Sequence, residues 1–247
     1  MSEELTVARD GAVTHLTLNR PDIANALGPV LTESLLDAVH TAAQDGTRLL
    51  VMEGTGKSFC SGFDLSGFDD LSDGDLVLRL LRIETLLQAV YHAPFPTLAM
   101  GHGRIFGAGA DLFSACSQRV AAPGTQFRMP GLAFGIVLGT RRLVARIGQD
   151  AARNIQNETR TFDAAEAKGY NFASDIADPS EWPGIVEAAA QAAQTLSVEA
   201  SAALFTVTAP DMRAQDMADL VKSASIPGLK DRIGKYRDDM RRAAGKA

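Results

Sequence analysis

Residues 54–65 read G-T-G-K-S-F-C-S-G-F-D-L and residues 101–112 read G-H-G-R-I-F-G-A-G-A-D-L, and these two stretches decide how the chain folds. Each follows a short apolar segment, 48–53 or 96–100, that predicts a buried strand. Their glycines allow the backbone to approach another group closely. Taken singly, each stretch is also compatible with a tight turn from a strand into a helix that serves packing alone.

The same two stretches offer candidate hydrogen-bond donors from the main chain. Gly62 would leave the amide of Phe63 exposed. Amides near Ala108 and Gly109 would lie at the positive end of the helix expected to start there, where an oxyanion or a phosphate is stabilised. The alternative to packing is therefore a set of backbone donors for a negatively charged oxygen.

Two common nucleotide-binding motifs do not fit these glycines. Gly56-Lys57-Ser58 resembles the end of a P-loop, but that motif needs a glycine five residues before Gly56, where the chain has Val51. In the second stretch, Gly103 and Gly107 are separated by three residues, whereas the dinucleotide fingerprint leaves two. Neither motif predicts a nucleotide site.

Working outward, the chain alternates short strands and helices and then becomes helical. A hairpin is expected around Asp10-Gly11, within residues 5–18, and further strands are expected at 118–122 and 125–129. After Val137 the strand signals largely disappear. The expected helices cover 29–40, 75–91, 139–147, 150–157, 163–168 (with Asp163 and Glu166 arranged as a capping box) and 187–196. This order predicts an α/β core over residues 1–190 and a helical extension over residues 191–247.

The composition sets limits on the function. The chain has 247 residues, 46% hydrophobic and 22% charged, which is typical of a globular protein. A net charge of −6 argues against a general nucleic-acid binder, since phosphate backbones attract basic surfaces. Cys60, Cys116 and the four histidines lack any metal-ligand spacing, so no metal site is expected. The acidic start without an apolar run, and the absence of a long apolar segment, predict a cytoplasmic protein that does not enter membranes.

Together, the two glycine-rich stretches resemble the crotonase (enoyl-CoA hydratase/isomerase) superfamily. The resemblance extends from about Leu16 to Gly169, with the separations between motifs that the family shows. It is carried by Asn25-Ala26-Leu27 and by residues 58–65, 103–112, 130–143 and 165–169. Each motif is weak alone, but the ordered set is specific. It implies a spiral of ββα units followed by a helical C-terminal region that covers the active site and joins subunits into trimers or dimers of trimers.

The resemblance also implies a function and a set of site residues. The chain is expected to act on an acyl-coenzyme A thioester, with coenzyme A as part of the substrate and no permanently bound cofactor. The amides of Phe63 and Ala108 are the expected oxyanion-hole donors for a thioester enolate, and Asp111 the expected proton-transfer group. Contacts to the thioester and coenzyme A are expected at Ala24, Ala26, Lys57, Ser61, Gly62, Asp64, Leu65, Gly107 and Gly131.

The chain departs from the family at the catalytic carboxylates. The resemblance implies that hydratases of this family place two glutamates over the substrate. In this chain the two corresponding positions are Asp111 and Gly131. Members with other chemistry place an aspartate at about Gly139, which is also glycine in this chain. Ordinary two-carboxylate hydration is therefore in doubt. Proton transfer by Asp111 alone, loss of turnover with retention of acyl-CoA binding, and a pocket widened for a bulky acyl group are the alternatives.

Other charged residues have structural and functional interpretations. Asp64 is expected to cap a helix that follows it. Arg104 and Arg128 could meet a polar or carboxylate acyl tail, or could pair with Asp111 and Asp64. The basic residues of the C-terminal stretch form a solvated helical face or, by resemblance, bring positive charge to coenzyme A phosphates. These residues are Lys222, Lys230, Arg232, Lys235, Arg237, Arg241, Arg242 and Lys246.

Overall fold

The hairpin expected around Asp10-Gly11 begins the fold. In the computed structural model, which describes residues 3–244, β1 (Leu5–Asp10) pairs antiparallel with β2 (Val13–Leu18), and Gly11 has a φ of 56° in the turn. Lys246, named above among the basic residues, lies outside the described residues.

The central sheet continues from this hairpin in parallel. Its strand order is β1-β2-β3-β4-β6-β9, and every pair after the first is parallel. The further strands are β3 (Leu49–Gly54), β4 (Thr97–Gly101), β6 (Gln118–Ala121) and β9 (Asp175–Ile176). All five residues of β4 are buried, because helices cover both faces and a continuous apolar run is favoured there.

A second, smaller sheet produces the spiral. It contains β5 (Arg104–Phe106), β7 (Gln126–Arg128) and β8 (Thr161–Asp163), and a parallel bridge joins Cys60 to Ile105. The chain passes from β4 into β5 and then into α3 (Ala108–Ala115), and similarly from β6 into β7. Each turn therefore adds one segment to each sheet before a helix follows, which confirms the α/β fold of repeated ββα units.

Three short strands were not predicted. The sequence indicated a turn where β5 lies and only helices after Val137, where the structure has β8 and β9. Each has three residues or fewer, which is too short for an alternating pattern to be seen. The capping box at Asp163 was predicted in part, since Asp163 accepts from the Glu166 amide while the Glu166 side chain pairs with Arg160.

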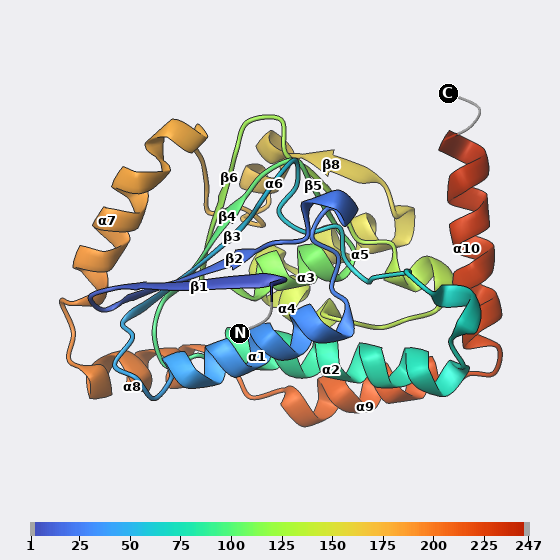
Figure 1. The fold of residues 1–247 in the computed structure, drawn as a ribbon, viewed down its shortest axis with the longest axis horizontal. Helices are drawn as coiled ribbons and strands as arrows, with labels where there is room; N and C mark the ends of the chain where they lie inside the picture. Colours follow the sequence, from blue (N-terminus) through green and yellow to red (C-terminus); the bar gives the residue numbers. More distant parts are fainter. Residues whose placement is uncertain (1–2, 245–247) are drawn as a thin grey trace.

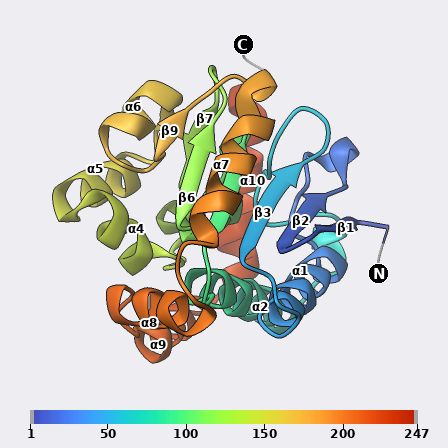
Figure 2. The ribbon, with the colours of Figure 1, turned by 90° about the vertical axis from the view of Figure 1, so that its left-hand side faces the viewer.

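Helices form the outer layers (Figure 1). Figure 2 shows α7 lying across one face of the central sheet, where its buried alanines pack against Leu49, Val51 and Leu98. On the opposite face, α1, α2 and α3 enclose the main core. The helices are α1 (Pro29–Ala42), α2 (Asp73–Tyr91), α3, α4 (Thr140–Ile147), α5 (Gln149–Glu158), α6 (Ala164–Gly169), α7 (Trp182–Ala193), α8 (Val198–Thr208), α9 (Arg213–Ala224) and α10 (Leu229–Ala244). Short 3-10 turns are η1 (Pro21–Ile23), η2 (Phe68–Asp70), η3 (Gly131–Phe134) and η4 (Pro179–Glu181).

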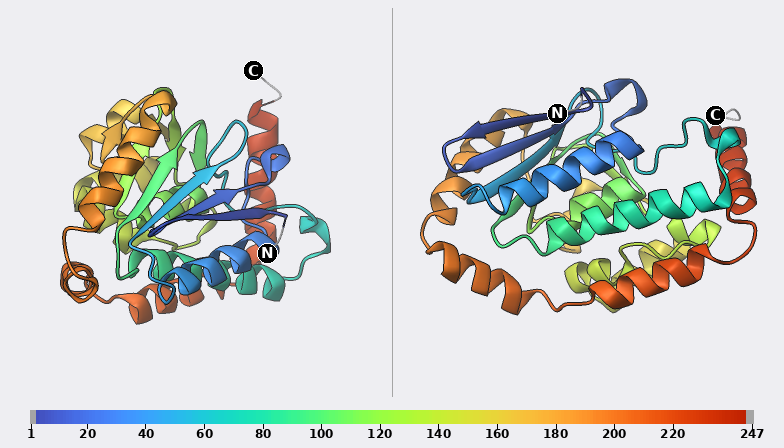
Figure 3. Two further views of the ribbon diagram at one scale, coloured as in Figure 1. Left: turned by 60° about the vertical axis from the view of Figure 1, so that its left-hand side comes forward. Right: turned by 60° about the horizontal axis from the view of Figure 1, so that its bottom comes forward.

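The last three helices run beneath and beside the core. Figure 3 shows α9 alongside α2, and α10 standing at the far end of α2. A separate apolar cluster joins these elements, with Leu80 from α2, Leu220 from α9 and Ile233 from α10. The division into residues 1–190 and 191–247 stays a prediction.

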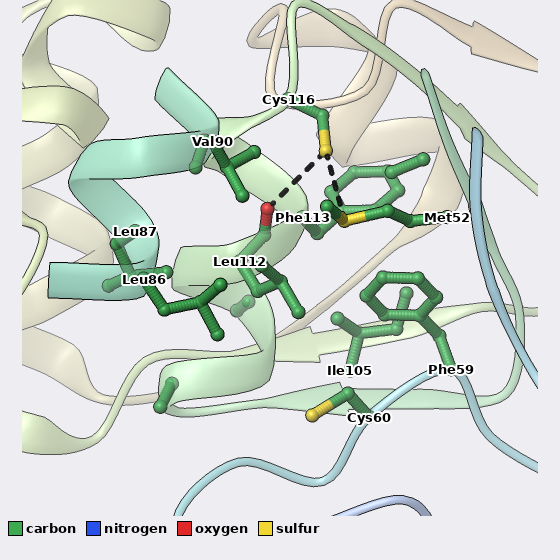
Figure 4. Packing of buried hydrophobic residues seen from close by; sticks show 14 of the residues in the cluster. Met52, Phe59, Cys60, Leu86, Leu87, Val90, Ile105, Leu112, Phe113 and Cys116 are labelled. Atoms are coloured by element: carbon green, nitrogen blue, oxygen red, sulfur yellow. Dashed lines mark hydrogen bonds between the residues drawn. The ribbon is translucent and has the colours of Figure 1, made fainter. Parts of the chain in front are cut away.

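The main core surrounds the second glycine-rich stretch. Figure 4 shows the sulfur of Cys116 near Met52 and the carbonyl oxygen of Leu112, with Phe59 and Phe113 in the same cluster. Burial raises the pKa of both the Cys60 and the Cys116 thiols to about 12. Both cysteines therefore serve packing, because a buried thiol is a poor nucleophile.

Candidate active site

The two glycine-rich stretches lie against each other. The amide of Phe59 donates to the His102 carbonyl at 2.9 Å, and that of Phe106 donates to the Cys60 carbonyl at 3.2 Å. Side chains are excluded at the contact, because a Cβ added to Gly103 would overlap the backbone of Lys57. The glycines predicted that the backbone approaches another group closely, and that group is the backbone of the other glycine-rich stretch.

The contact brings two amides to one place. Gly62 has a φ of 97°, and a Cβ on it would lie 2.5 Å from the Phe106 carbonyl oxygen and 3.1 Å from the Ala108 nitrogen. Ala108 is the first residue of α3, so its amide has no acceptor within the helix. Within residues 3–244, neither the Phe63 amide nor the Ala108 amide donates to another group. Free amides beside a helix start favour a negatively charged oxygen.

A cavity of about 260 Å³ opens beside these amides. Seven of the predicted site residues line it: Ser61, Phe63, Leu65, Gly107, Ala108, Asp111 and Gly131. Most of the remaining lining is apolar: Leu80, Phe106, Met129, Pro130, Leu132, Phe134, Ile136, Leu138, Ile233 and Met240. Three polar or charged side chains, Arg128, Gln156 and Tyr236, complete it. An apolar cavity with a few convergent polar groups is typical of a small-molecule site.

The other predicted contact residues lie outside the cavity wall. Ala24 is next to it, since its carbonyl accepts from the Ser61 amide at 2.9 Å. Ala26 is buried, and its carbonyl accepts from the guanidinium of Arg20. Lys57 is exposed. Gly62 contributes through its backbone, as described above.

Asp64 does not cap a helix, contrary to the prediction. Its carboxylate accepts from Arg20 Nη1 and from the Ser66 amide, each at 2.8 Å, and the next helical turn, η2, begins after Gly67. Burial opposes its ionisation, but the hydrogen bonds from Ser66 and Arg20 hold the pKa of Asp64 below its usual value. The ion pair therefore fastens the loop after β2 to the first glycine-rich stretch.

Asn25 serves the same loop in a way that sequence reasoning did not assign. It is fully buried with a φ of 55°, and its Nδ2 donates to the carbonyls of Thr55 and Ser58 at 2.9 and 2.8 Å. Its Oδ1 accepts from the Arg20 amide at 2.7 Å. A polar residue in the Asn25-Ala26-Leu27 motif was the available signal, and its role is to hold the start of the first stretch.

Asp111 lies in the first turn of α3 and is 5% exposed. Burial raises its pKa to about 8, and Arg142 opposes this while Glu84 adds to it. Among the described residues, its Oδ1 has no hydrogen-bond partner. This oxygen lies against Gly139, where any side chain would overlap it. Asp111 also lines the cavity, so its carboxyl can meet a ligand there, and it prefers to keep its proton at neutral pH.

A buried ion pair lies behind Asp111. Arg142 of α4 binds both carboxylate oxygens of Glu84 of α2, at 2.5 and 2.8 Å, and the two side chains are only 3% and 1% exposed. Arg142 also contacts Asp216 of α9 at 3.1 Å. This network joins three helices and places a positive charge near the reacting end of the cavity.

Arg104 and Arg128 do not pair with Asp111 or Asp64, which corrects one of the two predictions for them. Arg104 is exposed, and Arg128 donates to the Thr159 carbonyl at 2.7 Å and contacts the sulfur of Met240. Across residues 3–244, neither makes an ion pair.

The last helix forms one wall of the cavity. Ile233, Tyr236 and Met240 of α10 line it, and the ring of Tyr236 lies 5.1 Å from that of Phe134. Several basic residues of this region are engaged within the chain, since Arg237 pairs with Asp69 and Arg232 donates to the Phe134 carbonyl. A role for these charges at coenzyme A phosphates stays a prediction.

Between residues 3 and 244, no three His, Cys, Asp or Glu side chains gather in a way that could hold a metal ion. In the same range, no helix combines the length and apolar character needed to span a membrane.

Comparisons with known proteins show which family this chain resembles. A family model described as enoyl-CoA hydratase/isomerase matches residues 8–225. The Mycobacterium bovis protein named probable enoyl-CoA hydratase echA6 is 33% identical over 177 residues, covering 69% of this chain and 71% of the relative. The 2,3-dehydroadipyl-CoA hydratase of Escherichia coli is 31% identical over 178 residues, covering 70% and 69%. A Bordetella parapertussis crystal structure, provisionally assigned as an enoyl-CoA hydratase/isomerase, is 46% identical with a TM-score of 0.94, covering 95% of this chain and 98% of that one.

Proposed function

This chain belongs to the enoyl-CoA hydratase/isomerase family, and on that premise we propose that it converts an acyl-CoA thioester through an enolate, with Asp111 moving the proton. The observation that supports this proposal is the shared cavity. It contains two free backbone amides, Phe63 and Ala108, and one buried carboxyl without a hydrogen-bond partner at Oδ1 among residues 3–244.

The chemistry follows from where charge develops. When a thioester loses a proton at its α-carbon, the electron pair of the C–H bond moves to the carbonyl oxygen and an enolate forms. The amides of Phe63 and Ala108 donate to that oxygen and stabilise it more than the neutral carbonyl. Asp111 in its ionised form accepts the proton and returns it, either to the α-carbon or to the γ-carbon, in which case the double bond shifts.

The same proposal assigns the binding residues. Coenzyme A enters as part of the substrate, with the pantetheine arm passing Ala24, Ser61 and Gly107, and Lys57 reaching toward the phosphates. The entrance to the cavity is formed by the backbone around Ala26, Gly62, Asp64 and Leu65. Gly131 lies at the acyl end, and the assembly is proposed to be a trimer or a dimer of trimers.

Gly131 supports a second candidate function, an acyl-CoA binding protein without turnover. Within the cavity as described by residues 3–244, Asp111 is the only carboxylate, whereas the hydratases that the chain resembles have two. In this case the cavity and the amides would be retained for binding alone.

One experiment separates these functions. The purified protein is given 2-enoyl, 3-enoyl and 3-hydroxyacyl thioesters of several lengths, and turnover is measured beside thioester binding. Asp111→Asn is expected to lower turnover by about 10²-fold or more while binding persists. Asp150→Asn is the matched control, because Asp150 is an exposed acid in the first turn of α5. Equal activity of Asp111→Asn and wild type would remove Asp111 from the mechanism, and binding without any turnover would favour the binding protein.

A further inference from the structure

The end of the cavity that holds Asp111 carries a second buried polar side chain. Gln156 of α5 is 7% exposed and lines the cavity. Its Nε2 donates to Thr140 Oγ1 at 3.3 Å. Its side-chain oxygen accepts no hydrogen bond from residues 3–244, so that acceptor is available to a ligand. The side chain is more than nine-tenths buried, yet this oxygen is not enclosed by protein, so it can accept a hydrogen bond from a group in the cavity.

Gln156 and Asp111 both lie against the short segment formed by Gly139 and Thr140. Thr140, which holds Gln156, directly follows Gly139, whose Cα lies against the carboxyl of Asp111. A carboxyl and a carboxamide therefore face one end of one cavity from either side of Gly139 and Thr140.

Gly131 leaves room at this end. It lines the same cavity and begins η3, against which α5 packs. A Cβ added to Gly131 would meet the Ile136 carbonyl oxygen at 3.1 Å and no other atom within 4 Å. The volume that a glutamate would fill in the two-carboxylate hydratases is therefore open to a small polar group, such as a water molecule.

We infer that Gln156 is a catalytic residue that holds an oxygen at the β-carbon of the acyl group, either the attacking water or the 3-hydroxyl of the product. The inference rests on the proposed function and deepens it, because it names the residue that would hold the oxygen at the β-carbon of such a thioester.

One carboxylate is enough for the addition of water to the double bond. The water oxygen forms a bond to the β-carbon, and the π electrons of the double bond move through the α-carbon to the carbonyl oxygen. Ionised Asp111 accepts one proton of the water and then delivers it to the α-carbon, which restores the carbonyl. Gln156 accepts a hydrogen bond from the proton that the oxygen keeps, and it exchanges no proton. A neutral amide suits this position, because a second carboxylate would further oppose the ionisation of Asp111.

The test compares two reactions of the full-length protein. One is hydration of a 2-enoyl-CoA, and the other is exchange of the α-protons of the saturated acyl-CoA of equal length in deuterated water, which needs only the amides and Asp111. Gln156→Leu is expected to lower hydration by about 10²-fold and to leave exchange unchanged. Gln149→Leu, the same substitution at an exposed position of α5, is the control and is expected to change neither.

Two further variants separate catalysis from folding. Gln156→Glu keeps an acceptor oxygen and is expected to retain hydration with its pH profile moved upward, since the new carboxylate opposes ionisation of Asp111. Thr140→Val removes the anchor of the amide and is expected to give a smaller loss of hydration than Gln156→Leu.

The outcomes are distinct for the two proposals. Unchanged hydration in Gln156→Leu, or an equal fall in hydration and exchange, would overturn the role of Gln156. A wild type that exchanges α-protons but hydrates no 2-enoyl thioester would overturn it as well and leave the proposed function standing. A wild type that performs neither reaction would remove the proposed function and this inference with it.

Discussion

Two groups of buried polar atoms are neighbours in space and differ in how their hydrogen-bonding capacity is used. Behind the cavity, the two terminal nitrogens of Arg142 donate to Glu84 and Asp216 across three helices, and only its Nε lacks a partner among residues 3–244. Inside the cavity, the Asp111 carboxyl and the Phe63 and Ala108 amides have unused capacity among the described residues. Paired buried charges hold a fold together, whereas unpaired ones destabilise it and are retained where a ligand supplies the partner.

Breaking the paired group is expected to have the largest effect. Glu84→Ala leaves Arg142 buried with only Asp216 in contact, so the free energy of unfolding should fall by about 3–5 kcal/mol. Urea denaturation followed by circular dichroism measures this. Glu33→Ala is the control, because Glu33 pairs with Arg82 at the surface with 45% of its side chain exposed, and about 0–1 kcal/mol is expected there. Similar losses in the two variants would show that the buried pair contributes no more to the free energy of unfolding than the surface pair.

Removing one unpaired donor should affect activity rather than folding. Ala108→Pro deletes the amide hydrogen at the first position of α3, where proline fits the helix geometry. The rate of thioester turnover is expected to fall by about 10²–10³-fold, with thermal stability close to wild type. Ala108→Ser keeps the amide and should retain activity. A fully active Ala108→Pro protein would exclude this amide as an oxyanion donor.

The pH dependence of turnover reports the ionisation of Asp111, the unpaired carboxyl. Because burial raises the pKa of Asp111 to about 8 and the proposed base is its ionised form, kcat/KM should rise by about tenfold per pH unit below pH 8 and level off above it. Steady-state rates across this range, corrected for spontaneous thioester hydrolysis, measure the profile. A plateau that begins near pH 5 would contradict a buried protonated carboxyl.

The last expected effect is on stability at neutral pH. An unfolded chain loses the Asp111 proton above about pH 4, whereas the folded chain keeps it up to about pH 8, so this group lowers the stability of the fold as pH rises between those values. Asp111→Asn should therefore raise Tm at pH 7 by several degrees, while its Tm equals that of wild type near pH 4. Differential scanning calorimetry at both pH values decides this, and a lower Tm at pH 7 would show that the carboxyl is stabilised in the fold.

Much of the fold could be predicted, because periodic apolar residues and turn glycines act locally. Helix α2 and the β1–β2 hairpin follow from such patterns. The short strand β5 could not be predicted, since three residues carry no period and its pairing with β7 depends on tertiary contact.

The candidate site divides in the same way. The positions of Phe63 and Ala108 followed from glycines beside them and from the family resemblance. Gln156 and Glu84 gave no signal, because nothing in a helical pattern tells which buried polar residue faces a cavity and which faces another helix. Asp64 was misassigned, since its partner Arg20 lies 44 residues away in sequence.

The contact between the two glycine-rich stretches has a consequence for how the sequence can vary among related proteins. The free donors belong to the main chain, so any side chain at 63 or 108 that fits the surrounding core leaves the amides unaltered. Gly62 and Gly103 have no such freedom, because any side chain there would push one stretch away from the other. In a set of related sequences, we therefore expect these two glycines to be retained more strictly than the residues that carry the donors.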